Sequence, residues 1–600
     1  MTHAIRDDFI FIPLGGGRRL AARLFRPQGT GRFPAILDFS PYRCFDLFRS
    51  PTEMTLPTWA AAGYATLAID IAGAGGSTDV LRDEYLPSEI DDAFAAIAWC
   101  AGQDWCDGNV GLSGLSWAAF TALRVAARKP SALKALVLGG VSEDGWRTDI
   151  HYLGGVPYTA QIDWAGVMLM FNALPPDPLQ AGETWRAQWL ERLQVNEPWI
   201  IPWLAHPTQD AYWTNKAAPT DGELPLLLYS GFADKYATSV LRIAENWKGP
   251  VRTVIGPWEH TMPHVATREP RIGFSQLALD WWDRHLKGID APDIAPVTVW
   301  TGERWCAVAE TRPLLLALNG ATLVDAPDDR WHRLPDRSAL PVKLRSDLYE
   351  DAPAAFDVTG LLTAASDAMT KDREIGPLSR LRCEVRGTGH LIARLLDRAP
   401  DGTATRMTTG ALSVTAAGTI TLPFQASAWT LKAGHQLVLA LSADGWPTFW
   451  PRQSTLELRD VRLELPLISG PDTTFPAPVV PPGPVMGKPR WLKAEPVGLS
   501  ADPDAAMHET TTAYHLEPTG TDYGIAARFE ARRLPGDRAW AAKSYRVAFE
   551  RPGWSIRIDT RLEVRSTPDA YEVSWAVAAA EEGREVHKSE RKTTVKRNSG

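Results

Sequence analysis

The sequence predicts a parallel α/β sheet that is interrupted by a block of helices and followed by strand-rich segments. Three observations lead to this fold class. The first 145 residues alternate continuous apolar runs with helical patterns. Residues 146–219 are helical and aromatic, and helical patterns nearly vanish after residue 290. Alternating strands and helices are typical of a parallel sheet that helices cover on both faces.

The strands of this sheet are expected to be continuous apolar runs, because a strand buried on both faces has no polar side to alternate with. Such runs lie at residues 33–40, 64–73, 109–114, 132–140, 224–231 and 251–257. Between them, Ser88-Glu89-Ile90-Asp91 resembles a capping box that opens a helix. A second helix is expected over 118–128, ending before Pro130.

These patterns divide the chain into a sheet domain, a cap and three later segments. The helical block is expected to cover the carboxyl edge of the sheet, where ligands bind in open α/β folds. The segments after residue 290 are predicted to form short strands separated by turns that contain Gly, Pro and Asp. The segments are 1–145 and 220–310 for the sheet domain, 146–219 for the cap, 311–469 for a β-sandwich, 470–490 for a proline-rich linker and 491–600 for a β-rich C-terminal extension.

Composition argues against several function classes. The formal net charge is -8, from 71 acidic and 63 basic residues that are well mixed, so no basic stripe suggests a nucleic-acid partner. The five cysteines are scattered without C-x-x-C spacing and are expected to be reduced thiols, with no metal site. The first residues carry no signal-peptide pattern, and no run reaches the roughly 18 apolar residues of a membrane span. We therefore expect a cytoplasmic protein without membrane contact.

The stretch GLSGLSWAAF, residues 111–120, contains the candidate nucleophile. A nucleophilic serine of the G-x-S-x-G type sits on a tight strand-to-helix turn and needs small neighbours. Ser116 has Gly114 before it and Ala118 after it, and it stands between a predicted strand and a predicted helix. Ser113 lies inside the strand, and its hydroxyl is expected to be satisfied locally.

A serine hydroxyl becomes nucleophilic only when a neighbouring base accepts its proton. The partners are expected after later strands, in the order serine, acid, histidine. Asp234 and His260 follow the two predicted strands that come after the helical block. We expect His260 to accept the Ser116 proton and Asp234 to orient the imidazole.

Other candidates for the acid and the base are less favoured. His264 lies deeper in its loop, and no third ligand accompanies it and His260 as a metal pair. Asp70 precedes the serine in the chain, which favours a role in a turn. His285, His151 and His206 are expected to be core or surface residues.

The oxyanion of an acyl-transfer reaction needs two preorganised donors. One is expected from the backbone N–H of Trp117, the residue after the nucleophile. The second should come from the loop FSPYRCFD, residues 39–46, which has no glycine run but can offer the phenolic O–H of Tyr42. The alternative for Tyr42 is an ordinary half-buried aromatic residue.

With these residues in place, the chain resembles the cocaine-esterase-like (CocE/NonD) hydrolases, which are related to X-Pro dipeptidyl-peptidases and α-amino-acid ester hydrolases. The matching segments are SPYR (40–43), GYATLAIDIAGAGGS (63–77), WCDGNVGLSGLSWAAF (105–120), HPTQDAYW (206–213), GFADKY (231–236), GPWEH (256–260), WWDRHLKG (281–288), LIARLLDRAPDG (391–402) and LKAGHQLVLALSADGWPTF (431–449). The resemblance implies an α/β-hydrolase fold with an inserted helical cap and a jelly-roll β-sandwich. It also implies the triad Ser116, Asp234 and His260, with Tyr42 as an oxyanion donor.

The chain departs from the family pattern at two positions. The family commonly has S-Y-x-G at the nucleophile, whereas this chain has Trp117 where the tyrosine stands. The family segment D-x-R-G-x-G-x-S appears here as residues 70–77 with Ala72 in place of the arginine. Pocket shape and one electrostatic contact are therefore expected to differ.

The function that these features predict is a serine hydrolase without cofactor, acting on a small-molecule ester or amide through an acyl-enzyme. Trp164, Met168 and Phe171 of the cap are candidates for an apolar or aromatic acyl pocket. An X-Pro dipeptidyl-peptidase or aminopeptidase, which needs carboxylates such as Asp163 and Asp177 to hold a free amine, and an acyltransferase are alternatives. A β-sandwich binding protein with an inactive hydrolase domain is the alternative from another class. The β-rich domain is expected to support the hydrolase domain and to offer contacts for a homo-oligomer.

Overall fold

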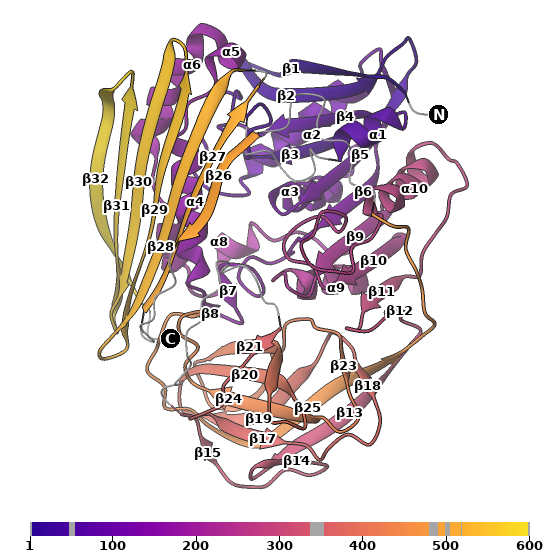
Figure 1. Ribbon diagram of the computed structural model, residues 1–600, viewed down its shortest axis with the longest axis vertical. Coiled ribbons are helices and arrows are strands. Elements are labelled where there is room, and N and C mark those ends of the chain that lie inside the picture. Colours follow the sequence, from indigo (N-terminus) through magenta and orange to yellow (C-terminus); the bar gives the residue numbers. More distant parts are fainter. Residues whose placement is uncertain are drawn as a thin grey trace.

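The computed structural model describes residues 3–46, 55–335, 353–478, 490–497, 505–517 and 519–597. These residues form three large β-sheets and a set of helices that pack mainly around the first sheet and between the first and third (Figure 1). No helix in this part of the chain is long and apolar enough to cross a lipid bilayer.

The first sheet has ten strands in the order β1-β2-β4-β3-β5-β6-β9-β10-β11-β12. Strands β4 through β11 of this order run parallel, and β1, β2 and β12 are antiparallel to their neighbours. All residues of β4 and β9 are buried, which is why the sequence shows them as apolar runs. The strands are β1 (Ile5–Gly15), β2 (Arg18–Pro27), β3 (Phe33–Ser40), β4 (Ala65–Asp70), β5 (Cys106–Leu115), β6 (Leu133–Gly139), β9 (Leu226–Gly231), β10 (Val251–Gly256), β11 (Val297–Trp300) and β12 (Trp305–Ala307).

Helices cover both faces of this sheet and create two hydrophobic cores. The helices α2 (Pro87–Ala101), α3 (Trp117–Ala127) and α9 (Ala237–Asn246) contribute to one core, and α1 (Leu56–Ala61) and α10 (Phe274–Leu286) contribute to the other. In the second core the rings of Trp59 and Trp282 meet edge to face, 6.0 Å apart.

The start of α2 differs from the predicted capping box. The N-cap is Leu86, it makes no side-chain capping bond, and Pro87 is the first helical residue. Proline is favoured at that position because the first N–H groups of a helix have no intrahelical acceptor. Ser88 therefore lies inside the first turn, and the capping-box prediction is wrong.

A helical insertion separates β6 from β9. It begins after the carboxyl end of β6 and returns to the neighbouring strand, so it lies beside the edge where the strand-end loops meet. Its elements are β7 (Tyr152–Leu153), β8 (Val156–Pro157), α4 (Ala160–Ala173), α5 (Pro178–Ala181), η2 (Gly182–Thr184), α6 (Trp185–Val195), α7 (Ile200–Ala205) and α8 (Ala211–Thr214).

The second sheet contains thirteen strands around its own core of Leu, Val and Phe side chains. The register of its longest antiparallel pairs, β13 with β25 and β20 with β21, is continuous over most of their length. The strands are β13 (Glu310–Asn319), β14 (Thr322–Val324), β15 (His332–Arg333), β16 (Ala354–Ala355), β17 (Leu362–Ala365), β18 (Arg373–Ile375), β19 (Arg380–Arg386), β20 (Gly389–Arg398), β21 (Ala404–Val414), β22 (Gly418–Pro423), β23 (Trp429–Leu431), β24 (Gln436–Ser442) and β25 (Glu457–Ser469).

The third sheet is a seven-stranded antiparallel meander, in which each strand pairs with the next along the chain. Figure 1 shows it as the yellow and orange sheet beside α4 and α6. Of the predicted linker, residues 470–478 form no helix or strand apart from an isolated bridge between Cys306 and Asp472, and Gly273 N–H donates to Pro476 O at 2.7 Å. Residues 479–489 lie outside the described residues. The strands are β26 (Arg490–Val497), β27 (Ala505–Leu516), β28 (Thr521–Leu534), β29 (Arg538–Arg551), β30 (Trp554–Ser566), β31 (Ala570–Glu581) and β32 (Arg584–Lys596).

Candidate active site

Ser116 occupies a sharp turn between β5 and α3. Its φ of 60° and ψ of -126° are unusual for a residue with a side chain, and such strained positions recur at functional turns. The turn depends on a small neighbour, because a Cβ added to Gly114 would lie 2.5 Å from the carbonyl carbon of Ala118. Ser116 N–H donates to Gly139 O at 3.0 Å, which fixes the turn to the adjacent strand. Ser113, in contrast, is buried within β5.

Asp234 and His260 lie on the loops that follow β9 and β10. The Nδ1 atom of His260 is 3.0 Å from Oδ2 of Asp234. The Asp234 side chain is 3% exposed and that of His260 is 29% exposed. Asp234 therefore lies in the interior, and His260 is the more accessible member of the pair. The same Asp234 oxygen accepts a hydrogen bond from Ser230 Oγ at 3.3 Å. The imidazole also needs a glycine beside it, because a Cβ on Gly140 would lie 2.7 Å from its Cε1.

Tyr42 lies on the loop after β3, and its side chain lines the same cavity as Ser116. Burial raises the pKa of Tyr42 well above its ordinary value, although the neighbouring Ser116 opposes that rise, so the phenol keeps its proton. The next residue anchors the loop: Arg43 has a φ of 63° and donates to Asp46 Oδ2 at 2.6 Å and to Pro175 O at 2.7 Å. The phenolic O–H is therefore held beside the serine.

Trp117 is the first residue of α3, where backbone N–H groups have no intrahelical acceptor. Its indole is fully buried and its Nε1–H donates to Oε1 of Glu89 at 2.8 Å. Burial raises the pKa of Glu89 to about 7, and the hydrogen bonds from Thr121 and Trp117 oppose that rise. The indole that replaces the family tyrosine thus has a buried partner on α2.

A cavity of about 170 Å³ connects these side chains. Ser116, Tyr42, Asp234 and His260 all lie in its wall. Its remaining lining residues are Tyr85, Ile150, Trp164, Val167, Lys235 and Tyr236. The structure therefore brings the predicted nucleophile, acid, base and phenol to one place.

The predicted acyl-pocket residues divide into two groups. Trp164 lines the cavity that Ser116 also lines. Met168, one helical turn after Trp164 on α4, is instead 1% exposed in the hydrophobic core. Phe171 packs behind Tyr42, with ring centroids 6.1 Å apart. Val167 lies in the cavity wall and was not predicted.

Sequence reasoning also missed Tyr85, Ile150, Lys235 and Tyr236. Lys235 and Tyr236 directly follow Asp234, so their place on the same strand-end loop was a usable signal. Tyr85 and Ile150 carry no comparable signal, because their approach depends on how the loops before α2 and within the insertion fold.

The competing acid and base candidates lie elsewhere. His264 is buried against Phe274, and burial lowers its pKa to about 4. Burial raises the pKa of Asp70 to about 7, and its Oδ1 accepts the Cys44 N–H at 2.6 Å, which is a loop-holding role. His285 packs on Trp281.

The two histidines of the insertion do not line the Ser116 cavity either. His151 is buried, with its Nε2 atom 3.0 Å from a carboxylate oxygen of Glu84. His206 is partly exposed and pairs with Asp210 at 2.6 Å. Both have the core or surface roles that were expected.

The segment 70–77, which has Ala72 where the family has an arginine, is instead contacted by an arginine from the helical insertion. Arg192 of α6 is buried and donates to Gly75 O at 2.9 Å and to Ser77 O. Burial lowers the pKa of Arg192 to about 9. The loop after β4 is therefore tied to the helical insertion.

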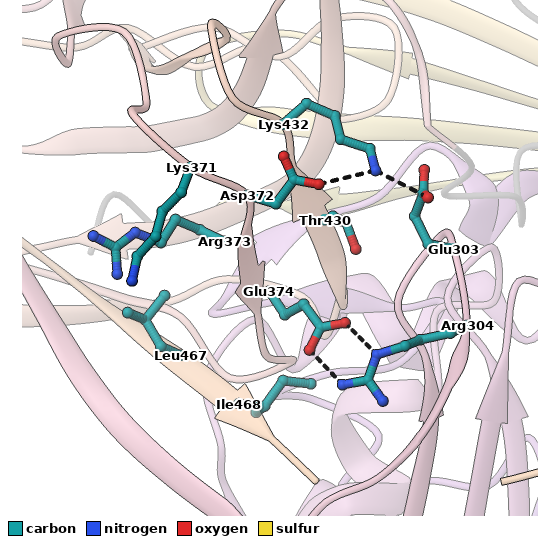
Figure 2. Close-up of a pocket in the computed structure, with 10 residues that line it drawn as sticks. All are labelled: Glu303, Arg304, Lys371, Asp372, Arg373, Glu374, Thr430, Lys432, Leu467 and Ile468. Atoms are coloured by element: carbon teal, nitrogen blue, oxygen red, sulfur yellow. Dashed lines mark hydrogen bonds and ion pairs between the residues drawn. The ribbon is translucent and has the colours of Figure 1, made fainter. Parts of the chain in front are cut away.

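A second cavity, of about 520 Å³, lies where the first and second sheets meet (Figure 2). Its charged side chains largely pair with one another. Figure 2 shows Arg304 directed at Glu374, 2.7 Å away, and Lys432 between two carboxylates. The described lining contains no serine, histidine or cysteine, so this larger cavity lacks the serine and histidine that meet in the Ser116 cavity. Among the described residues, no cluster of three or more His, Cys, Asp or Glu could hold a metal ion.

Comparison with known sequences identifies two family regions in the chain. Residues 16–262 match the X-Pro dipeptidyl-peptidase (S15 family), and residues 377–470 match the X-Pro dipeptidyl-peptidase C-terminal non-catalytic domain. A cocaine esterase of Rhodococcus sp. (strain MB1 Bresler) is 27% identical over 319 residues, which cover 46% of this chain and 54% of the esterase. A putative Xaa-Pro dipeptidyl-peptidase of Streptomyces avermitilis is 28% identical over 182 residues, covering 24% of this chain and 26% of that protein. The chain thus spans about half the length of the first relative and about a quarter of the second.

Solved structures show the same fold over most of the chain. A CocE/NonD family hydrolase from Staphylococcus aureus is similar with a TM-score of 0.59 at 16% identity, covering 78% of this chain and 97% of that one. An aminopeptidase from a Thaumarchaeota archaeon has a TM-score of 0.60 at 17% identity, with the same coverage. An α-amino-acid ester hydrolase also has a TM-score of 0.60, at 16% identity, covering 78% of this chain and 97% of that one. The predicted resemblance is confirmed. The third sheet follows both family regions in the chain.

Proposed function

Because the chain belongs to the serine hydrolase family of esterases and X-Pro dipeptidyl-peptidases, we propose that it cleaves small carboxylic esters or amides through an acyl-enzyme on Ser116. One observation carries the proposal. A serine on a strained strand-to-helix turn, a histidine paired with a buried carboxylate and a protonated phenol line one cavity.

The proposed chemistry follows from the placement of these side chains. Asp234 pairs with Nδ1 of His260, and Nε2 would accept the Ser116 proton as Oγ attacks the acyl carbon. The oxyanion would accept hydrogen bonds from the Tyr42 O–H and the Trp117 N–H. His260 then returns the proton to the leaving alcohol or amine, and water cleaves the acyl-enzyme by the same steps. A bound amine in place of water would make the product of an acyl transfer.

The cavity supports a small to medium apolar acyl group. Its volume of about 170 Å³ and its lining by Trp164, Val167 and Ile150 favour an aliphatic or small aromatic group. Recognition of a substrate amine is less well supported, because the two acidic residues suggested for it have other partners. Asp163 pairs with Lys543, and Asp177 pairs with Arg551.

We also propose an assignment of the domains of this architecture. We assign the helical insertion as the cap of an α/β-hydrolase domain and the second sheet as a jelly-roll. The domain limits are those predicted from the sequence, with residues 146–219 as the cap and residues 311–469 as the β-sandwich.

The test is pre-steady-state hydrolysis of p-nitrophenyl acetate and butyrate. Wild type should release a burst of nitrophenol equal to the enzyme concentration, and Ser116→Ala should release none. Ser113→Ala, which alters a buried serine of the preceding strand β5, is the matched control and should keep the burst. A normal burst from Ser116→Ala would rule out this nucleophile. Folded wild type without any burst or turnover would favour a binding protein with an inactive hydrolase domain.

A further inference from the structure

The third sheet packs against α4, the helix that contributes Trp164 and Val167 to the wall of the Ser116 cavity. Its strands β29 and β30 lie along α4, and β32 lies against α6 and α7. Figure 1 shows α4 between this sheet and the first sheet. The helix that carries Trp164 and Val167 into the cavity is therefore covered on an adjacent face by residues from far along the chain.

One lysine makes the central contact with α4. The side chain of Lys543, on β29, is 9% exposed, and its Nζ lies 2.5 Å from Oδ1 of Asp163. Its aliphatic stem lies on Gly166, because a Cβ added there would be 2.6 Å from Lys543 Cγ. The ring of Tyr545 lies 5.0 Å from the ammonium group. Lys543 thus contacts α4 through both its charge and its stem.

These contacts fall on the turn of α4 that forms the cavity wall. Asp163 and Gly166 face the sheet, while the neighbouring Trp164 and Val167 line the cavity. Trp164 is further oriented by donating to Oε2 of Glu84 at 3.3 Å. A shift of this turn toward or away from β29 would therefore change the width of the cavity.

A second buried ion pair fixes the next part of the insertion to the same sheet. Arg551, at the end of β29, donates to both carboxylate oxygens of Asp177 at 2.8 Å. The Asp177 side chain is 1% exposed, and it also accepts the Leu179 N–H at the start of α5. Two-pronged arginine–carboxylate bonds fix orientation as well as distance. The insertion is thus held at two separate points.

From these contacts we propose that the third sheet sets the acyl specificity of the site, with Lys543 as a positioning residue that holds Trp164 and Val167 of α4 at the cavity. This inference rests on the proposed function. It assigns a role to a part of the chain that lies beyond both family regions.

The test compares variants that alter the contact from either side. Lys543→Ala removes the ion pair and the stem. Gly166→Ala instead adds a methyl group against the stem and moves α4 without removing a charge. Lys588→Ala is the matched control, because Lys588 is exposed on β32 and pairs in register with Ala578. Each full-length protein is assayed for kcat and KM with p-nitrophenyl acetate, butyrate, hexanoate and benzoate, and for hydrogen exchange of peptides from α4.

The expected result is a change in acyl preference with little change in basal chemistry. For Lys543→Ala and Gly166→Ala, the ratio of kcat/KM for hexanoate to that for acetate should change at least tenfold. The kcat for acetate should stay within threefold of wild type, because acetyl is the smallest of the four acyl groups and depends least on the shape of the cavity. Exchange in α4 should rise in Lys543→Ala and stay unchanged in Lys588→Ala. If Lys543→Ala fails to fold, Gly166→Ala carries the test alone.

Two different failures can be told apart. Active variants with wild-type acyl preference and unchanged α4 exchange would overturn the inference and leave the proposed function intact. Wild type without activity toward any ester would overturn the proposed function, together with the role in specificity. In that case faster α4 exchange in Lys543→Ala would still support the positioning of α4, and unchanged exchange would refute it.

Discussion

Replacing Glu89 with glutamine is expected to change how stability depends on pH. Glu89 lies on α2 behind the nucleophile turn, where its Oε1 accepts hydrogen bonds from Trp117 and Thr121. Its Oε2 has no hydrogen-bond partner among the described residues. Burial raises the pKa of this carboxyl group from 4.5 to about 7. The folded protein therefore binds the Glu89 proton more tightly than the unfolded chain does.

The size of the effect follows from that difference. The free energy of unfolding falls as the pH rises from about 4.5 to about 7, because the unfolded chain releases the proton first. Above about pH 7 both states are ionised, and the folded state keeps the full cost of a buried charge. At about 1.4 kcal/mol per pH unit, the cost is roughly 3 kcal/mol. Glutamine keeps the acceptor oxygen for Trp117 and carries no charge at any pH.

Differential scanning calorimetry at pH 5 and pH 8 measures this effect. The difference in Tm between Glu89→Gln and wild type should become more positive by several degrees at the higher pH. Asp70 and Asp149, whose pKa values burial raises to about 7 and about 6, titrate in both proteins and cancel in the comparison. An equal mutational effect at both pH values would refute the reasoning.

Three further substitutions test the roles around Ser116. Tyr42→Phe removes one oxyanion donor and should lower kcat by about 10²–10³-fold with little change in KM, measured on p-nitrophenyl acetate; an unchanged kcat would remove Tyr42 from the oxyanion site. Asp234→Asn should lower kcat by about 10⁴-fold, because the amide no longer orients His260 as the carboxylate does; a loss below tenfold would contradict this. His264→Gln should keep kcat within about fivefold, since His264 is buried outside the cavity; a loss comparable with that of Asp234→Asn would make it the base.

The strands of the first sheet were readable from the sequence because they are buried on both faces. The apolar run 33–40 coincides with β3, and β10 differs by one residue from the run 251–257. The turn at Ser116 was also readable, because the crowding against Ala118 leaves room only for glycine at position 114. Steric crowding and burial of this kind depend on residues that are close in the sequence, so a local sequence pattern can predict them.

The residues that line the cavity and the packing of the third sheet could not be predicted from the sequence. Met168 and Val167 are adjacent apolar residues on one helix, and only the packing of α4 decides which of them enters the cavity. The partner of Asp163 is Lys543, which is too distant in sequence for any spacing rule. The prediction of a capping box at the start of α2 was wrong for another reason. The helix begins at Pro87, one residue before Ser88, the first residue of the apparent capping box.

The most direct test of the central claim is labelling of the full-length protein with a fluorophosphonate probe, followed by mass-spectrometric mapping of the modified peptide. We predict a single modified residue, Ser116, in the wild-type protein. Labelling should be lost in Ser116→Ala and should be at least tenfold slower in Asp234→Asn. Labelling at Ser113 would place the nucleophile three residues earlier, inside β5. No labelling of folded wild type would contradict the claim that this cavity contains an activated serine.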